Sequence, residues 1–140
     1  MIQFKKLNEE AIIPTKGHKE DSGWDLKILE TTMLKPFETK VIPTGIAINL
    51  PEGYEAQVRP RSGVTSKTKL RVQLGTVDNG YHGDIGVIVD NIGGTTVALD
   101  KGYKLAQLVV APVSFMESEE VSEFSNKTER GTNGFGSTGV

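Results

Sequence analysis

Residues 75–83 place a carboxylate and an aromatic hydroxyl among glycines. Asp78 and Tyr81 flank the pair Asn79-Gly80, which lies between two runs of alternating apolar residues (Leu70, Val72 and Leu74; Ile85, Val87 and Val89). An Asn-Gly pair between such runs predicts a tight hairpin, because both residues accept the positive φ that the turn needs. The stretch is therefore either a plain hairpin with a polar turn or one whose glycines let a bound molecule approach the backbone.

Polar side chains at three further places in the sequence could either form a binding site or have only a structural role. The stretch Arg59-Pro-Arg-Ser-Gly63 brings two guanidiniums and a hydroxyl to the end of an expected strand, as a solvated basic loop or as an anion site. Gln107 lies in an otherwise apolar run. A buried glutamine must be hydrogen-bonded, so its amide either bonds to other groups within the core or faces a site. Asp25 stands at the start of another expected strand, exposed to water or in a site.

The C-terminal residues 130–140 read Arg-Gly-Thr-Asn-Gly-Phe-Gly-Ser-Thr-Gly-Val. Glycines lose the most backbone entropy on ordering, so a frayed terminus is one interpretation. The other is a lid that closes over a ligand. Arg130, Ser137 and Thr138 can donate hydrogen bonds to an anion, and Phe135 can cover a flat ring.

Short strands must position these groups. A period of two predicts strands around residues 24–28, 41–50, 54–58, 70–74, 85–89, 95–99 and 103–110. Residues 61–69 lack this period and predict a loop with at most a short helix. Glycines and prolines separate the strands. The chain is therefore expected to be all-β, an antiparallel sandwich or barrel.

Composition limits the classes of function. A chain of 140 residues fits one domain that can bury its own core. Its 16 Lys and Arg against 18 Asp and Glu give a net charge of −2, so no basic footprint indicates nucleic-acid binding. The absence of cysteine excludes disulfides, thiolate metal sites and cysteine nucleophiles. No apolar run is long enough to span a bilayer and the N-terminus lacks a signal-peptide core, so a cytoplasmic protein with no membrane partner is expected.

Five of these stretches, in order, resemble the five motifs of the trimeric dUTPase family, the dUTP diphosphatases. They are Ser22-Gly-Trp-Asp-Leu26, Pro60-Arg-Ser-Gly63, Gly75-Thr-Val-Asp-Asn-Gly-Tyr-His-Gly83, Gly102-Tyr-Lys-Leu-Ala-Gln-Leu108 and Arg130-Gly-Thr-Asn-Gly-Phe-Gly-Ser-Thr-Gly139. Each motif is weak by itself, but the ordered set is very specific.

The resemblance implies a jelly-roll β-barrel or sandwich over residues 1–118, followed by a flexible Gly-rich C-terminal arm over residues 119–140 that closes over the active site. It also implies a homotrimer with active sites shared between subunits. Members of the family hydrolyse dUTP to dUMP and pyrophosphate, with Mg²⁺ held mainly by the triphosphate. This chain is accordingly expected to be a dUTP diphosphatase.

Roles for the hairpin residues follow from the same resemblance. Asp78 would be the general base that orients and deprotonates the water attacking the α-phosphorus. Tyr81 would lie under the deoxyribose and leave no space for a 2′-hydroxyl. Main-chain groups of the hairpin and nearby would pair with the uracil edge (Val72, Gly75, Thr76, Val77 and Gly86). A narrow pocket would exclude thymine, and main-chain pairing would disfavour cytosine.

Roles for the phosphate-binding residues are implied in the same way. Hydrogen-bond donors from two motifs would cradle the phosphates (Arg61, Ser62, Gly63 and Gln107). Asp25 would reach the shell of Mg²⁺ through water. From the arm, Arg130 would contact the γ-phosphate, Phe135 would stack on the uracil, and three further residues would donate to phosphates (Gly136, Ser137 and Thr138). Closing the arm would expel competing water.

Two positions depart from the family pattern, and two other functions compete. Trp24 stands where other apolar residues are frequent, and His82 stands where arginine is common, which puts in doubt any salt bridge made there. A dCTP deaminase has a similar fold but needs a carboxylate in the strand after the hairpin, and residues 85–89 contain none. The second alternative is a regulator of this fold that binds a protein partner, a role that the sequence leaves open beside catalysis.

Overall fold

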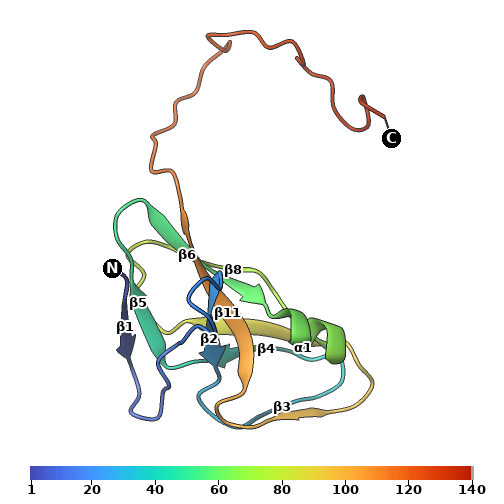
Figure 1. Ribbon diagram of the computed structural model, residues 1–140. Helices are drawn as coiled ribbons and strands as arrows, with labels where there is room; N and C mark the ends of the chain where they lie inside the picture. The colour runs from blue at the N-terminus through green and yellow to red at the C-terminus, as the bar shows by residue number, and fades with distance from the viewer. Residues whose placement is uncertain (140) are drawn as a thin grey trace.

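The computed structural model describes residues 1–139, and most of its regular structure is β-strand (Figure 1). Val140, the last residue of the predicted arm, lies outside the described residues. Within this part of the chain the one helix, α1 (Ser62–Lys67), is too short to cross a membrane. The strands are β1 (Gln3–Lys6), β2 (Gly23–Lys27), β3 (Thr32–Leu34), β4 (Thr39–Pro43), β5 (Ile46–Asn49), β6 (Tyr54–Pro60), β7 (Leu70–Val72), β8 (Gly75–Val77), β9 (Gly86–Asn91), β10 (Val97–Leu99) and β11 (Lys104–Pro112).

All strand pairs are antiparallel, and two larger sheets enclose one core. One sheet has the order β2-β11-β6-β8 and the other the order β4-β9-β7, with the pairs β1-β5 and β10-β3 beside them. Leu26, Val58 and Leu108 come from the first sheet, Ile42 and Val87 come from the second, and all five belong to the same buried cluster. Crossing connections between antiparallel strands are typical of jelly rolls. The predicted all-β antiparallel class is confirmed.

Burial follows the period of two in β6 but not in every strand, since β5 buries three consecutive residues. β6 buries Ala56 and Val58 on one face. β11 departs from the period, because Leu105 and Ala106 are both buried. The pairing of β11 with β2 skips Leu105, which marks a β-bulge. Beyond the bulge, Gln107 is only half-buried and lies on the outer face of the sheet.

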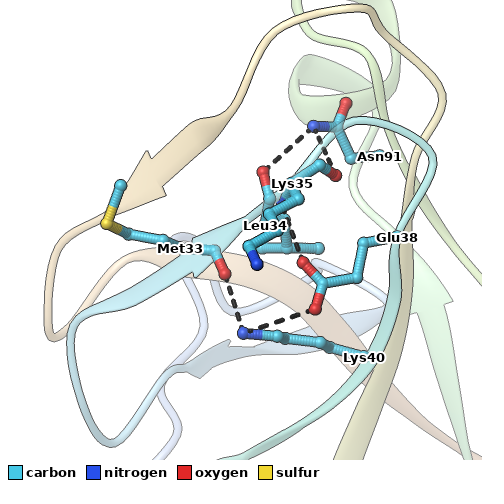
Figure 2. Close-up of polar contacts among 6 residues, drawn as sticks. All are labelled: Met33, Leu34, Lys35, Glu38, Lys40 and Asn91. Carbon is cyan, nitrogen blue, oxygen red and sulfur yellow. Dashed lines mark hydrogen bonds and ion pairs between the residues drawn. The ribbon is translucent and has the colours of Figure 1, made fainter.

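A buried asparagine fixes the turn between β3 and β4. Asn91, at the end of β9, is fully buried, and its amide donates hydrogen bonds to Leu34 O and Lys35 O at 3.2 Å each (Figure 2). In the same turn, Glu38 accepts a hydrogen bond from Lys35 N at 2.7 Å and lies 3.7 Å from Lys40 Nζ (Figure 2). The amide is thus satisfied within the core, as buried polar groups must be.

After β11 the chain leaves the body as an extended arm that arches away from the sheets (Figure 1). Within the described residues, the last backbone hydrogen bond from this segment to the body joins Val113 N to Gly53 O at 2.9 Å. Residues 113–139 form no helix or strand. The predicted boundary at residue 118 lies inside this extended segment.

Candidate active site

Polar side chains form a row across the outer face of the four-stranded sheet. Gln107 of β11 pairs with Asp25 of β2 on one side and with Arg59 of β6 on the other. Residues directly opposite one another in a sheet are neighbours on the same face. A carboxylate, an amide and a guanidinium therefore lie in line.

A cavity of about 460 Å³ opens at this row, and we call it the first cavity. Five of the predicted site residues line it (Asp25, Arg61, Ser62, Gly63 and Gln107), together with residues such as Asp21, Ser22 and Arg59. Arg61 Nε lies 3.0 Å from Asp25 Oδ1, and Lys104 Nζ lies 3.4 Å from Asp25 Oδ2. Guanidiniums beside hydroxyl and amide donors make this cavity suited to an anion such as phosphate.

Gln107 is held in the wall of the first cavity by close packing. Its Nε2 donates a hydrogen bond to Pro60 O at 2.9 Å. A Cβ at Gly23 would lie 2.4 Å from Gln107 Oε1, so a side chain at position 23 would displace the amide. Of the two interpretations given for Gln107, the structure thus favours the one in which it faces a cavity.

The donor set of the first cavity suits Mg²⁺ held mainly by phosphate groups. Within residues 1–139 no group of three or more His, Cys, Asp or Glu side chains could hold a metal ion. Asp25 supplies a single carboxylate, and its side chain is 14% exposed. Mg²⁺ is commonly bound through one or two carboxylates, waters and substrate phosphates. The residues present therefore fit the role predicted for Asp25.

The second cavity, of about 430 Å³, is lined by residues of β8 and β9 and of the segments beside them. Five other predicted residues line it (Gly75, Thr76, Val77, Tyr81 and Gly86), together with apolar side chains such as Val58, Leu74 and Ile88. A Cβ at Gly86 would lie 2.7 Å from Val41 Cγ1, and one at Gly75 would lie 3.2 Å from Val58 Cβ. The glycines therefore keep these walls at main-chain level, where a flat ring can meet backbone groups.

Tyr81 forms one wall of the second cavity. Its side chain is 48% exposed, and its hydroxyl donates a hydrogen bond to Asp84 O at 2.8 Å. A Cβ at Gly83 would lie 2.4 Å from Tyr81 Oη, so the ring occupies the space that a side chain there would need. The aromatic ring is thus placed by its neighbours in sequence.

The two apolar runs do pair, as β7 and β9, but the prediction that a tight turn connects them directly is wrong. β7 pairs with β9, but between them the chain inserts β8, which pairs with β6. Of the Asn79-Gly80 pair only Gly80 has positive φ, at +93°, and Tyr81 N bonds to Asp78 O at 3.1 Å. Asn79 instead uses its side chain, whose Nδ2 donates to Pro51 O at 2.8 Å and also to the neighbouring Tyr54 O. The asparagine anchors the turn to the body.

Two predicted residues of this region line neither cavity. Asp78 follows β8 directly and is exposed to solvent. Val72 lies in β7 with a side chain that is 7% exposed and packed in the core. A contribution of Val72 to a ligand would therefore have to come from its main chain.

The arm residues lie apart from both cavities. Arg130, Ser137 and Thr138 line a hollow of the arm itself, where Arg130 Nε donates to Asn133 O at 2.8 Å. Phe135 is fully exposed and has φ of +46°, and Gly136 follows with φ of +90°. In one copy of the chain, the predicted residues therefore form three separate groups.

The two unusual residues of the motifs make local contacts. Trp24 packs edge-on against Phe4 with ring centroids 6.1 Å apart, and Lys16 Nζ lies 4.2 Å from the centre of the indole ring. His82 Nε2 lies 3.2 Å from Asn49 Oδ1 on the surface. Both residues thus tie a motif to neighbouring segments of the chain.

Sequence reasoning missed a network around Asp84. This carboxylate accepts hydrogen bonds from the backbone N–H groups of Thr44 and Gly45. Thr44 is 1% exposed, which is unusual for a polar residue. The signal in the sequence is a Thr-Gly pair that interrupts two apolar runs, but its partner forty residues away is not visible there.

Comparison with known proteins decides the family. A family model described as dUTPase matches residues 9–139, which is most of the chain. The chain belongs to the dUTPase family. It is 49% identical to a deoxyuridine 5′-triphosphate nucleotidohydrolase of Clostridium novyi (strain NT), across 99% of each chain.

Solved structures of dUTPases show the same fold. The dUTPase of Staphylococcus bacteriophage 80alpha with dUpNHpp superposes with a TM-score of 0.93 at 35% identity, covering 100% of this chain and 99% of that one. A mutant dUTPase of S. aureus phage phi11, described as coordinating a structural Mg(II) ion, has a TM-score of 0.86 at 34% identity, over 90% of this chain and 99% of that one. The predicted family, jelly-roll fold class and kind of enzyme, a hydrolase of dUTP, are confirmed.

Proposed function

We propose that this dUTPase hydrolyses dUTP to dUMP and pyrophosphate with Mg²⁺, in active sites shared between three copies of the chain. The observation that carries the proposal is the second cavity, where glycines, main-chain groups and Tyr81 line one space. Its walls offer backbone hydrogen bonds to a flat base and an aromatic face to a sugar. Asp78 is the residue directly after the Val77 wall of this cavity.

Specificity is expected to come from the shape of the second cavity. Uracil presents one N–H donor between two carbonyl acceptors, a pattern that fixed main-chain groups can match and that cytosine does not present. The methyl group of thymine is expected to clash with the walls of this cavity. Tyr81, held by its hydroxyl, would lie under the deoxyribose and exclude a 2′-hydroxyl.

Asp78 is the proposed general base. It would accept a proton from a water whose oxygen bonds to the α-phosphorus, while the bond from this phosphorus to the bridging oxygen breaks and pyrophosphate leaves. A carboxylate fixed beside a turn can hold such a water in line with the leaving group. The anchoring of that turn by Asn79 supports this role.

The first cavity is the proposed phosphate site. Arg61, Ser62, Gly63 and Gln107 would donate to the triphosphate, and Asp25 would contact waters of the metal. When bound, Mg²⁺ would neutralise phosphate charge and orient the chain of phosphates. Both cavities and the arm lie apart in one copy of the chain, which supports sites assembled from several copies.

The test is release of pyrophosphate from dUTP, UTP, dTTP and dCTP in the presence of Mg²⁺, with ammonia followed for dCTP. We expect release from dUTP at a rate far above that from the other three. Equal release from all four would refute the role of the second cavity. Ammonia from dCTP would instead support a deaminase, although the one acid of β9, Asp90, is engaged by Thr39 and Gln73.

A further inference from the structure

The carboxylate of Asp84 holds the end of the loop that carries Tyr81. Asp84 is half-buried and lies in the wall of the second cavity. Its Oδ1 accepts a hydrogen bond from Thr44 N at 3.1 Å, and its Oδ2 accepts one from Gly45 N at 3.0 Å. Hydrogen bonds between a carboxylate and backbone N–H groups are charge-assisted and stronger than neutral ones.

The turn that receives Asp84 is itself rigid. The buried Thr44 hydroxyl donates to Ile85 O at 2.8 Å, and Ile85 N donates to Ile46 O at 2.9 Å. Gly45 has φ of +71°, and a Cβ there would lie 2.9 Å from Ala11 Cβ, so the position favours glycine. Asp84 is therefore fastened to a part of the body with little freedom to move.

The hydroxyl of Tyr81 is hydrogen-bonded to the main chain of Asp84. Tyr81 Oη donates to Asp84 O at 2.8 Å, while the ring is nearly half exposed. The carboxylate of Asp84 thus fixes the backbone, and the backbone oxygen fixes the tyrosine ring. Loss of the carboxylate would release the acceptor that holds the ring in place.

We infer that Asp84 is a positioning residue that, by clamping its own backbone onto Thr44 and Gly45, holds Tyr81 against the sugar and sets the discrimination between dUTP and UTP. The inference rests on the proposed role of Tyr81. Asp84 itself takes no part in the chemistry.

The test measures kcat/KM for dUTP and for UTP in Asp84→Ala, Asp84→Asn and Tyr81→Phe. In Asp84→Ala we expect kcat/KM for dUTP divided by kcat/KM for UTP to fall by about tenfold, which corresponds to the free energy of one lost hydrogen bond to a charged group. Asp84→Asn keeps an acceptor oxygen and should retain part of the ratio. Tyr81→Phe, which lacks the hydroxyl, should also lower it, and the double variant should lose no more than Asp84→Ala alone.

Asp90→Ala is the matched control. Asp90 lies at the other end of β9 and also accepts hydrogen bonds from two residues, Thr39 and Gln73. Its replacement should lower the melting temperature and leave the dUTP/UTP ratio unchanged.

Three results would overturn the inference. An Asp84→Ala protein with a lower melting temperature and an unchanged ratio would reduce Asp84 to a structural role. If Asp84→Ala does not fold, unchanged ratios in both Asp84→Asn and Tyr81→Phe would overturn it. A wild-type protein that hydrolyses dUTP and UTP alike would refute the role of Tyr81 itself, and that outcome is distinguishable from the other two.

Discussion

The carboxylate of Asp78 is exposed at the end of β8, where the next residue anchors the turn to the body. Asp78→Asn keeps the shape of the side chain and removes the base. We expect kcat to fall by about 10²–10⁴-fold, the usual contribution of a positioned base. Binding of dUTP, followed by calorimetry, should change little. Turnover equal to wild type would remove Asp78 from the role proposed for it.

At the scale of residues, the sequence predicts which side chains lie in the candidate site but not their hydrogen-bond partners. Residues such as Arg61 of the first cavity and Tyr81 of the second could be predicted, because they belong to motifs that resemble those of a known family. The clamp between Asp84 and Thr44 was not predictable, because it depends on which strands pair across forty residues. Asn79 does lie in a turn, but the sequence does not predict that its side chain anchors this turn to the body.

At the scale of elements, alternation predicted the strands that bury one face. β6 and β9 bury alternate residues, and both form as expected. β1 and β3 were missed, since β1 buries none of its side chains fully and β3 has only three residues. The insertion of β8 into the β7–β9 pair was also missed, because a local turn signal does not reveal pairing with β6.

Asp90 of β9 accepts hydrogen bonds from Thr39 of β4 and from Gln73, the residue after β7, and these bonds predict a dependence of stability on pH. Hydrogen bonds from Thr39 and then Gln73 lower the pKa of this carboxyl below its ordinary value of 3.8. Because the folded-state pKa is lowered, the contribution to stability is present above the ordinary value and is lost as pH falls from that value through the lower pKa of the folded state. Asp90→Asn should therefore melt lower than wild type at neutral pH, and the difference should shrink below about pH 4. A constant difference in melting temperature at both pH values would contradict this assignment.

The arm is expected to contribute to closure and not to the stability of the core. Beyond Val113, which bonds to Gly53, its described residues make no further backbone hydrogen bond to the body. Deleting residues 130–140 should leave the melting temperature near that of wild type. The rate of dUTP hydrolysis should fall by about a hundredfold or more, the size of one lost preorganised charge contact. A collapse of the melting temperature would place the arm in the core instead.

At the scale of the whole molecule, the separation of the arm from both cavities is the feature that a single sequence could not reveal. We predict an assembly of three 15.2 kDa chains, measurable by light scattering. Chains with Asp78→Asn and chains lacking residues 130–140 should each be nearly inactive alone. Refolded together, they should regain activity, because some sites then combine an intact Asp78 with an intact arm from another copy. If the activity of the mixture does not exceed the summed activities of the two variants, each site uses one chain only.

The most direct test of the proposed chemistry is hydrolysis of dUTP in water enriched in ¹⁸O, followed by mass spectrometry of both products. Attack of the water held by Asp78 on the α-phosphorus predicts dUMP that carries one ¹⁸O and pyrophosphate that carries none. Label in the pyrophosphate, or products other than dUMP and pyrophosphate, would contradict the account.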